Sequence, residues 1–367
     1  ILLWLGFKEL GGWDEMMRVC GAVTVNDYGD TMTNLIRSND DANFPWLGAL
    51  IGSAIIGFWY WCTDQFIVQR VLSGKNEMEA RRGTIFGAYL KLLPVFLFLI
   101  PGMIAFALHQ KYIGAGGEGF LPMLANGTAN ADAAFPTLVA KLLPAGVKGL
   151  VVCGILAALM SSLASLFNSS AMLFTIDFYK RFKPETPEKK LVGIGQIATI
   201  VIVVLGILWI PIMRSVGDVL YTYLQDVQSV LAPGIAAAFL LGICWKRTSA
   251  QGGMWGLISG MVIGLTRLGA KVYYSNAGEV ADSTFKYLFY DMNWLFFCGW
   301  MFLFCIIVVI VVSLATEAPT AEKIQGLVFG TATKEQKAAT RASWNHWDII
   351  HTVIILAITA AFYWYFW

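Results

Sequence analysis

The chain has 367 residues, of which 57% are hydrophobic and only 14% are charged. Soluble domains are about half apolar and about a quarter charged, so the shortage of charge indicates an integral membrane protein. The net charge of +2 is too small to indicate a nucleic-acid partner, and the sequence carries no nucleic-acid-binding motif.

The chain opens in an apolar run, residues 1–7, which is too short to cross a bilayer because a spanning helix takes about 20 residues. We expect the sequence to be the C-terminal part of a longer protein. Longer apolar segments follow, and their length and continuity predict spanning helices and not barrel strands. We predict eight spans, at about 45–70, 84–109, 148–178, 190–213, 218–244, 252–270, 293–315 and 347–366.

Every second loop between these spans is rich in lysine and arginine, which places those loops in the cytoplasm. The basic loops are 70–82, 180–190, 246–247 and 323–341, the last within a predicted linker at 317–346. The alternate loops, 110–147, 214–218 and 271–292, then face outward. The first outward loop carries a glycosylation triplet at Asn126, which chance also produces. The aromatic C-terminal residues 364–367 suit the outer membrane interface.

The sequence offers no catalytic or metal-binding cluster. Its six cysteines make no CxxC pair and five lie in apolar segments, so we expect small buried side chains without disulfides. None of the three histidines stands at ligand spacing from a cysteine or a carboxylate. An enzyme is disfavoured because no nucleophile–base pair and no phosphate-binding loop is present.

The first span is unusual because its cytoplasmic half carries Asp64, Gln65 and Gln69. Polar groups at that depth cost free energy unless they face a partner or a water-filled path. The segment is therefore predicted to line a site. Asp64 and Arg70, near the cytoplasmic end, are expected to form structural ion pairs beside the basic loop.

Glycine or proline interrupts two spans next to polar residues. Gly57 precedes the polar part of the first span, and the pair Pro233-Gly234 follows Gln225 in the fifth. Broken helices beside polar midplane residues are typical of transport sites. The amide of Gln225 both donates and accepts, which suits a sugar hydroxyl, but an interhelical hydrogen bond is an equal alternative.

Three further residues have two interpretations each. Lys91 lies within the second span, where it either donates to a ligand or a carboxylate, or extends to the nearer membrane surface. Tyr60 and Trp61 offer flat faces that could stack on a sugar ring, although aromatic residues in membrane helices more often pack or anchor.

Small residues share one face of the third span. Ala158, Ser161, Ser162 and Ser165 stand at i, i+3, i+4 and i+7. Hydroxyls and backbone carbonyls suit a hard cation such as Na⁺ that has shed its water. The same spacing is typical of close helix packing, and spacing alone favours that interpretation.

Three sequence blocks resemble the sodium/glucose cotransporter family of sodium–solute symporters, and the similarity covers nearly the whole chain. The blocks are 59–70, 89–94 continued by 101–104, and 158–169 continued by 173–177; Gln225, Pro233 and 245–247 are also in register. The resemblance implies an all-α polytopic membrane helix bundle with a leucine-transporter-like core of two inverted five-helix repeats, plus extra helices.

On this resemblance the sequence contains the second repeat and lacks the first. Residues 1–19 would be the tail of the last helix of the first repeat and the outer segment after it. Residues 45–244 would form the second five-helix repeat, and 245–367 would add three helices. The first repeat would supply the remaining sodium and sugar contacts.

The resemblance also implies roles for the residues singled out above. Ala158 through its carbonyl, and Ser161 and Ser162 through their hydroxyls, match the family's Na⁺ site. Tyr60 matches the aromatic inner gate below the sugar. The remaining sugar-site positions are matched by Trp61, Lys91, Gln225 and Gly57, the last standing where relatives place a polar residue.

The expected function is a secondary active transporter of the plasma membrane (the inner membrane in a bacterium) that couples Na⁺ entry to uptake of a glucose- or galactose-like sugar. Ala164 stands where members with a second sodium site carry a hydroxyl, which favours one Na⁺ per sugar. The alternatives are a Na⁺ symporter for inositol, an amino acid or a carboxylate, and a sugar sensor or channel of the same fold. The expected partners are a small polar solute and the lipid bilayer; no oligomeric state is predicted.

Overall fold

The computed structural model describes residues 1–124, 127–216, 220–277 and 281–367, so Asn126 of the glycosylation triplet and Asp218 of an outward loop lie outside the described residues. The described residues form helices and isolated backbone bridges, without strands of a sheet. The predicted helical bundle is therefore confirmed. The chain divides into two compact units, Ile1–Leu10 with Ile104–Asp218, and Gly11–Met103 with Val219–Trp367, and each is described by itself.

Six helical segments are long and apolar enough to cross a membrane: Glu77–Gly114, Ala145–Phe182, Glu188–Pro211, Leu220–Cys244, Trp294–Ala315 and His346–Tyr365. A seventh span is formed if the two helices Trp46–Cys62 and Gln65–Leu72, which meet at a bend of 51°, are taken together. These seven segments coincide with seven of the eight predicted spans.

The eighth predicted span, 252–270, lies in helix α12 (Ala250–Asn276), which is not among the helices apolar enough to span. Its 27 residues suffice in length, since a helix rises about 1.5 Å per residue. Its mean hydropathy is lowered by repeated glycines and by the charged residues Arg267 and Lys271.

The first unit contains two long helices that pack together, α8 (Ala145–Met172) and α10 (Glu188–Val216). A π-helical turn (Leu173–Tyr179) and α9 (Lys180–Phe182) extend α8. Helix α1 (Leu2–Leu10) contacts α7 (Ala134–Leu142), which follows a short 3₁₀ turn (Ala131–Ala133). The ammonium of Lys111, near the end of α6 (Ile100–Gly114), donates to the carbonyl of Glu9 at 2.8 Å.

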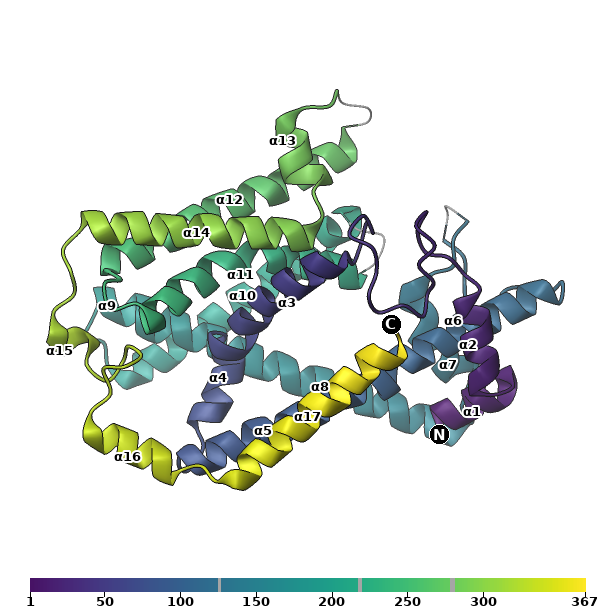
Figure 1. Ribbon diagram of the computed structural model, residues 1–367, viewed down its shortest axis with the longest axis horizontal. Coiled ribbons are helices and arrows are strands. Elements are labelled where there is room, and N and C mark those ends of the chain that lie inside the picture. The colour runs from purple at the N-terminus through teal and green to yellow at the C-terminus, as the bar shows by residue number, and fades with distance from the viewer. Residues whose placement is uncertain (125–126, 217–219, 278–280) are drawn as a thin grey trace. The chain divides into compact units, whose positions relative to one another are not determined.

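The second unit is built on four closely packed helices, α3 (Trp46–Cys62), α11 (Leu220–Cys244), α12 and α14 (Trp294–Ala315), with α11, α12 and α14 side by side in Figure 1. A core shared by α3, α11 and α14 contains Ile55, Ile56, Ala232, Ala236, Trp294, Leu295 and Cys298. The unit also contains α2 (Trp13–Gly21), α4 (Gln65–Leu72), α5 (Glu77–Pro94), a π-helical turn (Val95–Leu99), α13 (Thr284–Lys286), a π-helical turn (Tyr287–Asp291), α15 (Ala321–Ile324), α16 (Lys334–Ala342) and α17 (His346–Tyr365).

Helix α12 packs through a row of glycines spaced four residues apart. Gly252, Gly256, Gly260 and Gly264 are all buried. A Cβ built on Gly260 would lie 2.9 Å from the Cα of Gly234 on α11, and one on Gly264 would lie 2.4 Å from the carbonyl oxygen of Val230. The glycines therefore bring two backbones together, and this close approach is the reason that α12 is less apolar than its neighbours.

We predict that Gly264→Ala destabilises the protein by about 1–3 kcal/mol, because the backbone of Val230 cannot move away from the new methyl group. Gly269→Ala is the matched control on the same helix, since a Cβ there meets nothing within 4 Å. Thermal unfolding in detergent measures the difference. Equal unfolding temperatures for the two variants would contradict the packing described here.

The two ends of α17 contact different segments of the second unit. Near its start, His351 is hydrogen-bonded to Tyr89 of α5, which follows the basic loop. At its other end, Trp13 donates to the hydroxyl of Tyr365 at 3.0 Å, and the amide of Leu35 donates to the carbonyl of Phe366 at 2.8 Å. These contacts hold both ends of α17 within the second unit.

All six cysteines are unpaired, as expected, but only half of them are buried. Cys20, Cys298 and Cys305 are buried, whereas Cys62, Cys153 and Cys244 are exposed. The prediction of burial is wrong for the latter three because an apolar spanning helix also has faces that no other described helix covers.

The loop before α3 is ordered by a buried carboxylate. Asp41, only 4% exposed, accepts hydrogen bonds from the amides of Asn43 and Phe44, at 2.9 and 2.7 Å, and from the side chain of Asn26 at 3.1 Å. Arg37 lies 3.6 Å away. Burial is the largest influence and acts to raise the pKa of Asp41, but these hydrogen bonds and the Arg37 charge together lower it below its ordinary value.

A carboxylate whose pKa is lower in the folded than in the unfolded protein stabilises the folded state at any pH above the unfolded pKa, about 3.9. That stability is lost as the pH falls through the pKa of the carboxylate in the folded state. We predict that acidification below about pH 4 destabilises wild type more than Asp41→Asn. Asp40→Asn, an exposed neighbour, should keep the wild-type profile. Unfolding temperature measured against pH tests this, and identical profiles for the two variants would contradict it.

Candidate functional site

The first span is broken where the sequence places its polar residues. Helix α3 ends at Cys62, where the hydroxyl of Thr63 donates to the carbonyl of Trp59 at 2.7 Å. The carboxylate of Asp64 then caps α4 by accepting from the amide of Phe66 at 3.1 Å. Asp64 thus starts a new helix and makes no ion pair with any described residue.

The expected ion pairs of Asp64 and Arg70 are therefore wrong. The guanidinium of Arg70 lies 4.5 Å from the centre of the Phe66 ring instead. The physical reason is that a broken helix exposes backbone N–H groups at its new N-terminus, and the nearest carboxylate satisfies them.

Tyr60 and Trp61, one turn before the break, meet Lys91 of α5. The ammonium of Lys91 lies 5.9 Å from the centre of the Tyr60 ring and 5.4 Å from that of Trp61. The two rings stand edge to face, 5.4 Å apart. We call these three residues the aromatic–lysine cluster. The structure thus brings together three residues that the sequence analysis placed in one site.

Lys91 makes no ion pair or hydrogen bond with the described residues, so the ring faces are its nearest attractive partners there. Such contacts contribute about 0.5–2 kcal/mol and leave the three N–H donors of the ammonium available. A π-helical turn, Val95–Leu99, follows Lys91 between Pro94 and Pro101. Proline lacks an N–H donor, which accounts for the irregular helix at this point.

Gly57 lies three residues before Tyr60 on α3, and so on the same side of the helix. A Cβ added to Gly57 would meet nothing within 4 Å. The glycine is therefore not required by packing, and open space lies in front of it.

Gln225 lies on α11, half-buried and without a hydrogen bond to any described residue. No hydrogen bond or ring contact joins it to the aromatic–lysine cluster in the described part of the chain. The interhelical hydrogen bond considered above is therefore absent there, and both polar ends of the amide are available.

Ala158, Ser161 and Ser162 lie on α8 and are all exposed. The hydroxyls of Ser161 and Ser162 have no partner among the described residues, whereas Ser165 donates to the carbonyl of Ser161 at 3.0 Å. Exposure means that these residues serve no helix packing within the first unit. Helix α8 belongs to that unit, whereas the aromatic–lysine cluster belongs to the second.

A buried charge cluster went unnoticed in the sequence. The carboxylate of Asp226, next to Gln225 on α11, lies 3.4 Å from the guanidinium of Arg267 and 2.5 Å from the ammonium of Lys271 on α12. Arg267 is fully buried, donates to the carbonyl of Met292 at 2.8 Å, and lies 4.0 Å from the centre of the Phe297 ring. Asp226, Arg267 and Lys271 form what we call the charge triad.

The signal for the charge triad was present in the sequence as charges within apolar segments. Arg267 and Lys271 are four residues apart and so share a helix face. Charged residues inside membrane helices are rare and pair with one another. The triad ties the N-terminal half of α11 to α12 and to the segment before α14, and so restricts the rotation of the turn that carries Gln225.

The apolar helices, the broken span and the polar groups within the spans define a polytopic helical membrane protein. The family model of the sodium:solute symporter family matches residues 1–260. The chain belongs to this family.

Curated relatives carry solute names. The chain is 34% identical to the sodium/mannose cotransporter SLC5A10 of Bos taurus, over 100% of this chain and 65% of the relative. It is 38% identical to the human sodium/myo-inositol cotransporter 2, over 81% of this chain and 44% of the relative. It is 36% identical to the sodium/glucose cotransporter 1 of Ovis aries, over 86% of this chain and 50% of the relative. The chain thus spans about half to two thirds of the length of these relatives.

Proposed function

We propose that the protein at its full natural length is a secondary active transporter of the plasma membrane that couples Na⁺ entry to uptake of a sugar. The observation that carries this proposal is the aromatic–lysine cluster beside the break in the first span. It places an ammonium, which has no carboxylate partner among the described residues, next to two aromatic rings inside a membrane segment. The names of the relatives, which are cotransporters for mannose, inositol and glucose, support the same class of substrate.

In this proposal the Na⁺ ion binds on α8. The hydroxyls of Ser161 and Ser162 and the carbonyl of Ala158 provide oxygen ligands, which a hard cation requires. Their exposure leaves them accessible to a ligand. Ala164 has no hydroxyl to complete a second site, so we propose one Na⁺ per sugar.

The sugar is held by groups that match its hydroxyls and its ring faces. The Lys91 ammonium donates to hydroxyl oxygens, while Tyr60 and Trp61 present flat apolar surfaces to the ring. The Gln225 amide donates to one hydroxyl and accepts from another. In front of Gly57, water replaces the contact that a polar side chain would make.

Transport follows from the binding of both solutes to one conformation in preference to another. Na⁺ on α8 favours the outward-open state, and sugar binding then favours closure and opening to the cytoplasm. No covalent step is needed, because differential affinity for the two states suffices.

A polyol such as inositol is the second candidate substrate, because one relative carries that name. Uptake of labelled glucose into proteoliposomes, with unlabelled competitors, separates the candidates. We expect mannose and galactose to compete more strongly than inositol, and amino acids and carboxylates to have no effect. Competition by carboxylates alone would assign Lys91 to an acid and overturn the sugar proposal.

A further inference from the structure

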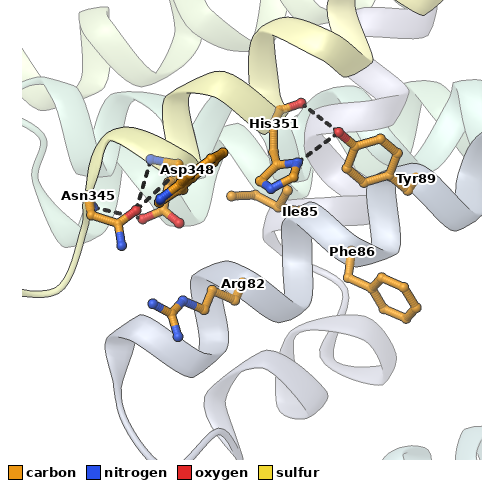
Figure 2. A pocket seen from close by; sticks show the side chains of 8 residues that line it. Arg82, Ile85, Phe86, Tyr89, Asn345, Asp348 and His351 are labelled. Carbon is orange, nitrogen blue, oxygen red and sulfur yellow. Dashed lines mark hydrogen bonds between the residues drawn. The ribbon is translucent and has the colours of Figure 1, made fainter.

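A groove between α5 and α17 has no role in the proposed transport site (Figure 2). Two adjoining cavities form it, of about 330 Å³ and about 430 Å³. Ile85 and Asp348 line both cavities, so the two cavities adjoin at the contact between α5 and α17 that these residues make. The groove lies at the end of α5 that follows the basic loop and at the start of α17, and the loop charges predict this to be the cytoplasmic end of both helices.

Two adjacent arginines stand at the cytoplasmic end of the groove. Arg82 lines the first cavity and Arg81 the second. Arg81 donates to the hydroxyl of Ser343 at 3.0 Å. Arg82 lies 3.9 Å from Glu79, with both side chains about half exposed, and a surface pair of this kind contributes little. Because a guanidinium carries five N–H donors, both arginines keep donors for a ligand.

The remainder of the groove is apolar and aromatic. Its membrane-facing lining consists of Ile85, Phe86, Ile349, Val353, Trp344 and Trp347. Phe86 is 62% exposed and Trp347 is 56% exposed, although both side chains are large and apolar. Tryptophan is enriched where a membrane meets water. The groove is thus cationic at its aqueous end and apolar along the membrane.

The polar groups on the floor of the groove are already paired. The hydroxyl of Tyr89 lies 3.0 Å from Nδ1 of His351, as Figure 2 shows. The carboxylate of Asp348 is buried and accepts from the amide of Asn345 at 3.1 Å, as part of the cap of α17. Asp348 therefore completes a helix end, where a negative charge is favourable, and the two arginines outnumber it.

We propose that this groove binds an anionic phospholipid of the cytoplasmic leaflet. The phosphate lies at Arg81 and Arg82, and the acyl chains follow Ile85, Phe86 and Val353 towards the membrane interior. Basic pockets between membrane helices on the cytoplasmic side bind such headgroups. A soluble phosphate would use the arginines but leave the apolar lining uncovered, so the lining favours a lipid.

The test is native mass spectrometry of the purified full-length protein, titrated with palmitoyl-oleoyl phosphatidylglycerol or with the phosphatidylcholine of the same chains. Wild type should retain phosphatidylglycerol in preference. Arg81→Gln/Arg82→Gln should bind it about thirty-fold more weakly, from the usual contribution of each basic residue near an anionic headgroup. Lys180→Gln/Arg181→Gln, which removes two charges from another basic loop, should stay within about twofold of wild type.

Two further arms make the outcome decisive. Phe86→Gln, which leaves both arginines in place, should also weaken phosphatidylglycerol binding if acyl chains occupy the groove. Glycerol 1-phosphate should not displace the lipid. The proposal would be overturned if wild type retained the two phospholipids equally, or if both double variants lost phosphatidylglycerol binding to the same extent. Displacement of the lipid by glycerol 1-phosphate would also overturn it.

Discussion

Replacing Ser162 by alanine is expected to raise the Na⁺ concentration that gives half-maximal sugar uptake by about ten- to a hundred-fold, because it removes an uncharged oxygen from the proposed Na⁺ site. The hydroxyl of Ser162 has no partner among the described residues, so its removal costs the fold little. Uptake should recover towards the wild-type maximum at high Na⁺. The measurement is initial uptake into proteoliposomes at a series of Na⁺ concentrations.

Ser165→Ala is the matched control for that experiment. Its hydroxyl lies on the same face of α8 but donates to the carbonyl of Ser161 at 3.0 Å, so it is occupied within the helix. We expect the Na⁺ dependence of this variant to stay within about twofold of wild type. The Na⁺ site proposed on α8 would be wrong if Ser165→Ala shifted the Na⁺ dependence as much as Ser162→Ala.

Arg267→Leu is expected to destabilise the protein by about 3–5 kcal/mol, because it leaves the Asp226 carboxylate with one cation fewer in a buried site. The carbonyl of Met292 also loses its hydrogen bond. Thr266→Ala, one residue earlier and exposed, should change stability by less than about 0.5 kcal/mol. Denaturant unfolding in detergent measures both values.

The same charge triad permits a second comparison. Arg267→Leu/Asp226→Leu removes both charges of this pair and leaves Lys271 without its carboxylate, as Asp226→Leu alone also does. The double variant should therefore be less destabilised than the sum of the two single variants. If the double variant were as unstable as the sum of the two single variants, the interaction between Asp226 and Arg267 would be absent. Gln225 stands next to Asp226, so transport by the double variant also reports whether the triad orients this amide.

The spans could be predicted from the sequence because hydropathy acts locally along the chain. Seven spans agree with the structure, whereas the orientation read from the loop charges stays a prediction. Helix α12 is the exception, since its glycines serve the approach of α11 and α14, which hydropathy does not register.

The candidate site could be predicted only in part. Tyr60, Trp61 and Lys91 do lie together, but their grouping depended on a family resemblance and not on spacing. The pairing of Asp226 with Arg267 joins residues 41 apart and depends on how α11 packs against α12. The role predicted for Asp64 was wrong because that role depends on where α3 ends. A shift of this helix boundary by one residue changes whether the carboxylate is a free surface charge or the cap of the next helix.

The most direct test of the account is accumulation of labelled glucose or mannose by proteoliposomes that contain the full-length protein. An inward Na⁺ gradient should concentrate the sugar above its external level, and an equal K⁺ gradient should not. Lys91→Ala should abolish the accumulation, since it removes the ammonium next to the rings of Tyr60 and Trp61. Accumulation that is independent of Na⁺, or unchanged in Lys91→Ala, would contradict the proposed coupling and the proposed site.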